Sequence, residues 1–66
     1  MEYSQLVLQV RKTLKITQEQ LASELGVSFS TVNRWEKGRA NPNNLAKRAL
    51  LQFCKDNDID IDEGSL

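Results

Sequence analysis

Polar side chains that can recognise the edge of a base pair stand close together between residues 30 and 37. The amide of Asn33 has the donor and acceptor that pair with N6 and N7 of adenine, and the guanidinium of Arg34 suits O6 and N7 of guanine. Ser30 can donate or accept a hydrogen bond. At helical spacing these residues and Lys37 lie on one side of a helix. Hydrogen bonding to bases is one interpretation of this side, and a solvated helix surface is the alternative.

Phe29 stands at the amino-terminal end of the same segment, and two roles are open to its ring. In the first role, the ring contacts the methyl group of a thymine in the groove that the neighbouring side chains read. In the second role, the ring belongs to the core and packs over Val27 or against the helix that follows. The sequence favours neither role over the other.

Two short helices have to position these side chains, one over residues 18–25 and one over residues 29–37. Their apolar positions fall on facing sides, which are formed by Leu21, Ala22, Leu25, Val32 and Trp35. The small side chain of Ala22 lets two steeply crossing helices approach closely. Gly26 supplies the left-handed backbone that commonly ends a helix. Two helices bent around Gly26, the second with an outward polar side, have the layout of a helix-turn-helix, which points to DNA.

Capping residues mark where these two helices begin and end. Thr17 stands in the N-cap position of the first, and Gln20 is three residues later in the capping-box position. Ser28 can cap the second helix. Gly38 then stops that helix in the same way as Gly26 stops the first.

Two further helices flank this pair. The first is predicted over residues 3–14 from an apolar stripe of Tyr3, Leu6, Val7, Val10 and Leu14. The last ends near residues 55–57 and has an apolar face of Leu45, Ala46, Ala49, Leu50 and Phe53. Either Pro42 begins this last helix with Asn41 as its cap, or Asn43 caps it.

The composition limits the kinds of function that the chain can perform. Its 66 residues suit one small domain without room for a catalytic cleft. With one cysteine, Cys54, and no histidine, neither a disulfide framework nor a zinc site of the usual type can form within it. No apolar run approaches the roughly 20 residues that span a bilayer, and the first residues lack the features of a signal peptide. We expect a cytoplasmic domain that is not an enzyme, holds no metal or cofactor, and has no membrane or small-molecule partner.

The formal charge of zero conceals an uneven distribution. Residues 1–55 contain nine Lys and Arg against four Asp and Glu, which gives +5, and residues 56–66 contain five acids and no base. A basic domain suits a phosphate backbone. We expect a folded domain over residues 1–57 and an acidic, flexible tail over residues 58–66. The tail either repels DNA, folds back onto the basic domain or stays solvated.

Three short stretches resemble the helix-turn-helix of phage repressors and Cro proteins, also called the xenobiotic-response-element family. They are Thr17-Gln18-Glu19-Gln20-Leu21-Ala22, Leu25-Gly26-Val27-Ser28, and Thr31-Val32-Asn33-Arg34-Trp35-Glu36-Lys37-Gly38 with Pro42 beyond. The resemblance is strongest over residues 17–42 and extends loosely over residues 6–53. It implies an all-α, lambda-repressor-like domain whose third helix enters the major groove. Family members usually have five helices, whereas this chain predicts four before the acidic tail and leaves a fifth open.

The resemblance also implies roles for particular residues. It assigns base reading to Phe29, Ser30 and Arg34, to which the helical wheel adds Asn33. It pairs Arg11 of the first helix with Glu36 of the third in a partly buried ion pair, so that Glu36 has a structural role and is not a catalytic acid. Arg11 sits at the edge of the first apolar stripe, which permits this pairing.

Contacts to the phosphates fall on the residues around these helix ends. The resemblance places Gln18 against a phosphate at the start of its helix, where free amide hydrogens and the helix dipole favour an anion. Thr17 and Ser28 are helix caps first, and any phosphate contact is additional. The residues that flank the reading helix can reach the backbone or stay solvated: Lys37, Arg39, Asn43 and Asn44.

Together these features predict a small sequence-specific DNA-binding transcriptional regulator that occupies an operator. Because modules of this size seldom bind tightly alone, two copies on a two-fold site, with half-sites about 34 Å apart, are the natural arrangement. Leu8 and Leu51 fall outside the apolar faces and are candidates for the contact between copies. The alternative is a protein-interaction module, such as an antitoxin or an accessory domain of a larger enzyme, and the acidic tail is its main support.

Overall fold

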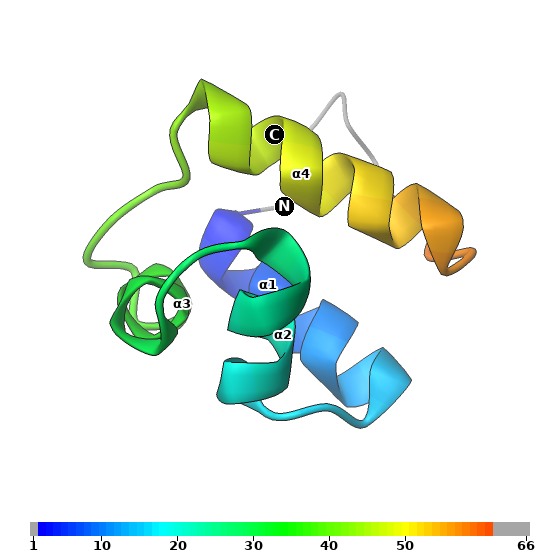
Figure 1. Cartoon of the computed structure of the whole chain (residues 1–66), viewed down its shortest axis with the longest axis horizontal. Helices are drawn as coiled ribbons and strands as arrows, with labels where there is room; N and C mark the ends of the chain where they lie inside the picture. The colour runs from blue at the N-terminus through cyan, green and yellow to red at the C-terminus, as the bar shows by residue number, and fades with distance from the viewer. Residues whose placement is uncertain (1, 62–66) are drawn as a thin grey trace.

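The structure is a computed structural model, and it describes residues 2–61. It contains the helices α1 (Tyr3–Leu14), α2 (Gln18–Leu25), α3 (Phe29–Glu36) and α4 (Asn44–Asp56), and residues 2–61 include no strand (Figure 1). The predicted all-α class is confirmed, and α1 and α2 have the predicted bounds. α3 ends one residue earlier than predicted, because Lys37 is its C-cap and Gly38 follows with a φ of 71°.

Side chains that precede α2, α3 and α4 accept hydrogen bonds from the first turn of each helix. Oγ1 of Thr17 accepts from the N–H of Gln20 at 3.0 Å, and the N–H of Thr17 donates to Oε1 of Gln20 at 2.8 Å, which completes a capping box. Oδ1 of Asn43 accepts from the N–H of Ala46 at 2.8 Å. Asn43 is therefore the cap of α4, and Pro42 is a buried residue of the preceding connection.

A turn of three residues, 26–28, joins α2 to α3. Gly26 opens this turn with a φ of 72°, a left-handed conformation in which a side chain is strained. Ala22 is only 3% exposed, so its small side chain lies inside the angle between the helices. Both α1 and α2 pack against α3. Figure 1 shows α3 at the edge of the molecule, seen nearly along its axis, with its outer surface away from the other helices.

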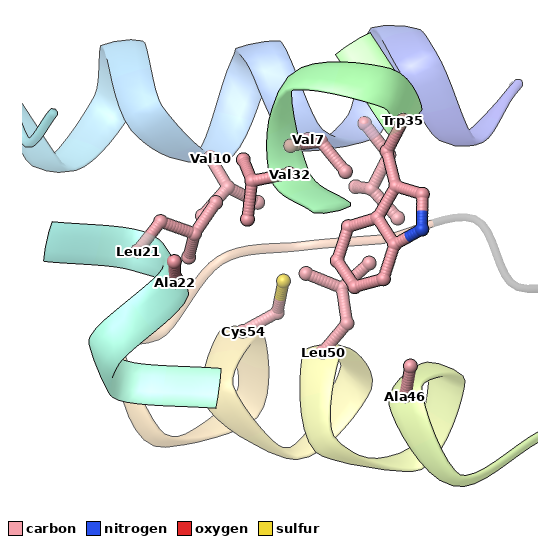
Figure 2. Close-up of a cluster of buried hydrophobic side chains, with 10 residues drawn as sticks. Val7, Val10, Leu21, Ala22, Val32, Trp35, Ala46, Leu50 and Cys54 are labelled. Atoms are coloured by element: carbon pink, nitrogen blue, oxygen red, sulfur yellow. The ribbon is translucent and has the colours of Figure 1, made fainter. Parts of the chain in front are cut away.

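Side chains from all four helices meet in one core (Figure 2). The buried apolar residues are Leu6, Val7 and Val10 of α1, Leu21 and Ala22 of α2, Val32 and Trp35 of α3, and Ala46, Leu50 and Cys54 of α4. The two residues from α3 are 0% and 3% exposed. α3 is therefore held along one side by the core, while its opposite side is left to solvent.

α4 keeps Ala46 and Leu50 of its predicted face in the core, with Phe53 packed against it, but the prediction was wrong at two positions. Leu45 was expected in the core but is 77% exposed, whereas Cys54 is fully buried. The buried positions of α4 recur every four residues at Ala46, Leu50 and Cys54, and Leu45 lies beside this stripe and points outward. Burial also raises the pKa of the Cys54 thiol to about 11, so that the side chain stays neutral and behaves as a small apolar group.

The chain turns back after α4 and returns alongside it. The N–H of Ile59 donates to the carbonyl of Cys54 at 2.8 Å, and Ile59 and Ile61 pack against the core. Figure 2 shows this segment passing between α1 and α4. The sequence predicts a flexible tail from residue 58, which stays a prediction. In the structure Asp58 has a left-handed φ of 57°, and beyond it Ile59 and Ile61 are half-buried while Asp60 is exposed. Residues 62–66 of the predicted tail lie outside the described residues.

An ion pair joins α1 to α3. Nε of Arg11 donates to Oε2 of Glu36 at 2.5 Å, and Nη2 donates to Oε1 at 2.8 Å, in a bidentate arrangement. Nη1 of Arg11 donates to the carbonyl of Ile16 at 3.3 Å, in the loop before α2. The side chains of Arg11 and Glu36 are 23% and 9% exposed. The two residues that the family resemblance paired are thus in contact, and they fix α3 against α1.

We expect this pair to make the fold sensitive to acid. Burial by itself raises the pKa of Glu36, but hydrogen bonds from Arg11 and Gln18 and the charge of Arg11 outweigh burial and lower it below the usual 4.5. Because the folded pKa is lower than the unfolded one, the carboxylate stabilises the fold above pH 4.5 and loses this contribution as the pH falls through the lowered pKa. Denaturant unfolding at a series of pH values measures this loss.

Glu36→Gln should remove most of the acid-dependent part and lower the free energy of unfolding at neutral pH. We expect a loss of about 2–3 kcal/mol, smaller than the about 3–5 kcal/mol of a fully buried pair because Arg11 keeps some contact with water. Lys12→Ala, which changes an exposed base of α1 next to Arg11, is the control. Equal stability of Glu36→Gln and the wild type across this pH range would contradict a stabilising pair.

Ile59→Ser and Ile61→Ser combined should lower the free energy of unfolding by about 1–2 kcal/mol, because two partly buried side chains lose apolar contacts. Leu45→Ser is the matched control, since that side chain is 77% exposed and its removal should change little. Urea denaturation of the full chain compares the variants. The same midpoint for all of them would show that the segment after α4 does not stabilise the core.

Candidate nucleic-acid interface

The outward side of α3 carries the hydrogen-bonding side chains that the sequence singled out. Ser30, Arg34 and Lys37 are exposed, and Asn33 is half-buried on the flank that faces the start of α2. The opposite side of the helix is anchored in the core through its two buried apolar residues. Because the core fixes the rotation of α3 about its axis, these polar side chains occupy a defined surface.

Phe29 is the first residue of α3 and is 49% exposed. The sequence left two roles open for this ring. The structure excludes one of them, because the ring is not part of the core. The ring lies at the surface at the amino-terminal end of α3. An apolar contact to a bound partner is therefore available to it.

Three hydroxyl groups cluster at the amino-terminal end of α3. Oγ of Ser28 accepts from the N–H of Thr31 at 3.2 Å and caps the helix. The same oxygen lies 2.7 Å from Oγ1 of Thr31 and 3.2 Å from Oγ of Ser30. The cap thus orients the Ser30 hydroxyl, which keeps further hydrogen-bonding capacity for a partner.

Gln18 connects the start of α2 to the flank of α3. Its Nε2 donates to Oε1 of Glu36 at 3.1 Å, and its Oε1 accepts from Nδ2 of Asn33 at 3.2 Å. Since Glu36 also accepts from Arg11, these four residues form one network that spans α1, α2 and α3. Sequence reasoning paired Arg11 with Glu36 through the family resemblance, but it treated Gln18 and Asn33 separately and missed their connection to this pair. The available signal was the spacing of Asn33 and Glu36, which three residues apart share one flank of a helix.

The residues expected at the phosphates fall into two groups. The side chains of Thr17, Ser28 and Asn43 already accept hydrogen bonds at the helix starts, so each of them has a structural role as a cap. Gln18 and Asn44 are the first residues of α2 and α4. Backbone N–H groups in a first helical turn lack acceptors within the helix and carry the positive end of its dipole, which favours an anion.

Two cationic side chains follow α3. Lys37 and Arg39 are exposed on either side of Gly38. The N–H of Arg39 donates to the carbonyl of Arg34 at 2.9 Å, so this short connection is held against the end of α3. Arg11, by contrast, has its charge paired with Glu36, and its pKa is raised by hydrogen bonding to that carboxylate and by its charge, in spite of some opposing burial.

Other kinds of site find little support in the part of the chain that the structure describes. Among residues 2–61, no group of three or more His, Cys, Asp or Glu side chains could hold a metal ion. None of the helices in this range is long and apolar enough to cross a membrane. Leu8, one candidate for a contact between copies, is 37% exposed, and Leu51, the other, is half-buried beside residues 58–61.

Comparison with known proteins agrees with this geometry. Residues 7–54 match the helix-turn-helix family. Over 63 residues the chain is 35% identical to the HTH-type transcriptional activator BcrR of Enterococcus faecalis, and the match covers 96% of this chain and 29% of that protein. The chain thus spans less than a third of the length of this curated relative. No solved structure matches the chain. With a family match over most of its length and the turn, caps and ion pair in place, the chain belongs to the helix-turn-helix family of the phage repressor and Cro type.

Proposed function

We propose that this chain is a sequence-specific DNA-binding domain of a transcriptional regulator and that α3 enters the major groove. The observation that carries the proposal is the division of α3 into a buried apolar side and an outward side of hydrogen-bonding and cationic side chains. Family membership supports the proposal, and so does a relative that is named a transcriptional activator. The domain acts by occupying its site, with no chemical step of its own.

Arg34 is the residue that contributes most to the choice of sequence in this proposal. Its guanidinium is exposed on the outward side of α3, and its fork matches O6 and N7 of guanine. Ser30 lies one turn toward the amino-terminal end, where its oriented hydroxyl can meet a second base edge. Phe29 beside it offers an apolar contact to a thymine methyl.

Contacts to the phosphates position α3 in the groove. Gln18 and Asn44 bring the amide groups of two helix starts to the backbone, and Lys37 and Arg39 add positive charge beyond the end of α3. The caps Thr17, Ser28 and Asn43 contribute mainly by holding those helix starts in shape, and a phosphate contact from any of them is secondary.

The proposed binding unit is a homodimer on a two-fold operator. A single module of this kind buries a small interface on DNA, and a second copy on a half-site about 34 Å away supplies the remaining affinity. Sedimentation of the chain with duplexes that carry one or two half-sites measures the stoichiometry once a preferred sequence is known.

Titration with a random-sequence duplex tests the DNA surface directly. We expect backbone amide shifts to change at Gln18 and over residues 28–39, and we expect the binding to weaken steeply between low and physiological salt, because cations around α3 displace counterions from the backbone. The amides of residues 50–57, at the far end of α4, serve as the internal control. An undisturbed spectrum at low salt would refute the proposed function for this chain.

Substitutions separate base contacts from phosphate contacts. On a selected duplex, Arg34→Ala should weaken binding by about 1–3 kcal/mol and relax the preference at one base pair. Lys37→Ala should weaken binding to all duplexes similarly and reduce the salt dependence by about one counterion. Lys55→Ala, an exposed base near the end of α4, should change neither quantity. Base preferences that survive Arg34→Ala intact would exclude that residue as a reader.

A further inference from the structure

The charge of Glu36 sets the direction of a chain of hydrogen bonds that ends at Asn33. A carboxylate can only accept, so the amide of Gln18 has to turn its Nε2 toward Oε1 of Glu36, at 3.1 Å. The other end of that amide, Oε1, can only accept as well, and it receives Nδ2 of Asn33 at 3.2 Å. One buried charge therefore fixes the orientation of two neutral amides on two different helices.

The position of Asn33 differs from that of the other polar residues of α3. Asn33 is half-buried, while Ser30 and Arg34 are exposed. Its side chain is short, and its Nδ2 leans across the flank of α3 toward the first residue of α2. Pairing with adenine requires Nδ2 and Oδ1 to face the base edge together. The contact to Gln18 draws the amide away from that direction.

Gln18 accepts this hydrogen bond from Asn33, and in the proposed function Gln18 contacts the DNA backbone. Gln18 begins α2, where the first-turn N–H groups and the helix dipole favour a phosphate. Its Nε2 has one hydrogen directed to Glu36 and a second hydrogen for a partner. A free glutamine side chain has several rotatable bonds, and two lateral hydrogen bonds hold it in one conformation before DNA arrives.

We infer that Asn33 is a positioning residue that holds Gln18 against Glu36 for a phosphate contact, and that it does not read a base. The assignment of Asn33 as an adenine reader from the helical wheel is thereby replaced. Sequence choice rests on Ser30 and Arg34, with Phe29, and Asn33 acts on affinity alone. The inference rests on the proposed function, because it states which residues of the same DNA-binding surface contact bases and which support a phosphate contact.

The test compares Asn33→Ala, Gln18→Ala and the double variant, with Ser30→Ala as the matched control on the outward side. Each full-length protein first selects from a library of randomised duplexes, which gives its base preference at every position, and then is titrated against the duplex that the wild type prefers. Asn33→Ala should lower affinity about threefold to tenfold, the range expected for one hydrogen bond, and leave every base preference unchanged. The double variant should bind no more weakly than Gln18→Ala, because both changes remove the same positioned phosphate contact of Gln18.

Two outcomes would overturn the inference. One is a relaxed preference at a single base pair in Asn33→Ala, which would make it a base reader, and the other is a double variant whose loss equals the sum of the single losses. Failure of the proposed function is a different result, in which the wild type itself binds no duplex. The side-chain NH₂ resonances of Gln18 in the free protein add a readout without DNA, since they should move in Asn33→Ala and stay in place in Ser30→Ala.

Discussion

The Glu36 carboxylate is the point at which three helices are fixed relative to one another. It lies on α3 and accepts hydrogen bonds from Arg11 of α1 and Gln18 of α2. A carboxylate that is 9% exposed has lost most of its water and stays charged only where donors replace that water. The donors come from separate helices, so satisfying one charge sets their mutual arrangement. Among the described residues no buried side-chain nitrogen or oxygen lacks a partner, which shows that the network is complete.

The small core also fixes α3, from the side of the helix that carries its buried apolar residues. Val32 and Trp35 are almost fully buried, and in a helix of eight residues they leave little freedom to rotate. Because its buried side anchors α3, the helix stays in place with polar and charged residues on its outer surface. The same packing fixes the positions of the outward side chains of α3 in the free chain, before any partner is bound. The fixed orientation of α3 is thus a property of its buried side.

Among the described residues, the acids that follow α4 lie beside that helix. Asp58 and Asp60 border a groove beside α4 together with Arg48 and Lys55. The described part of the acidic segment therefore turns back onto the domain beside α4. Its isoleucines pack against the core beyond the end of α4.

The sequence by itself determined the helices, the caps of α2 and α3 and the turn at Gly26, because capping residues, left-handed glycines and helical periodicity depend on residues within a few positions of one another. It also indicated which side of α3 faces outward, and the resemblance supplied the partner of Arg11. Only the tertiary structure decided that Leu45 points to solvent and that Ile59 and Ile61 pack inside. It alone also joined Gln18 to residues 15 and 18 positions away. These features depend on contacts between residues that are far apart in the sequence. Residue spacing predicts which side of a helix is apolar, but it does not predict which other segment packs against that side.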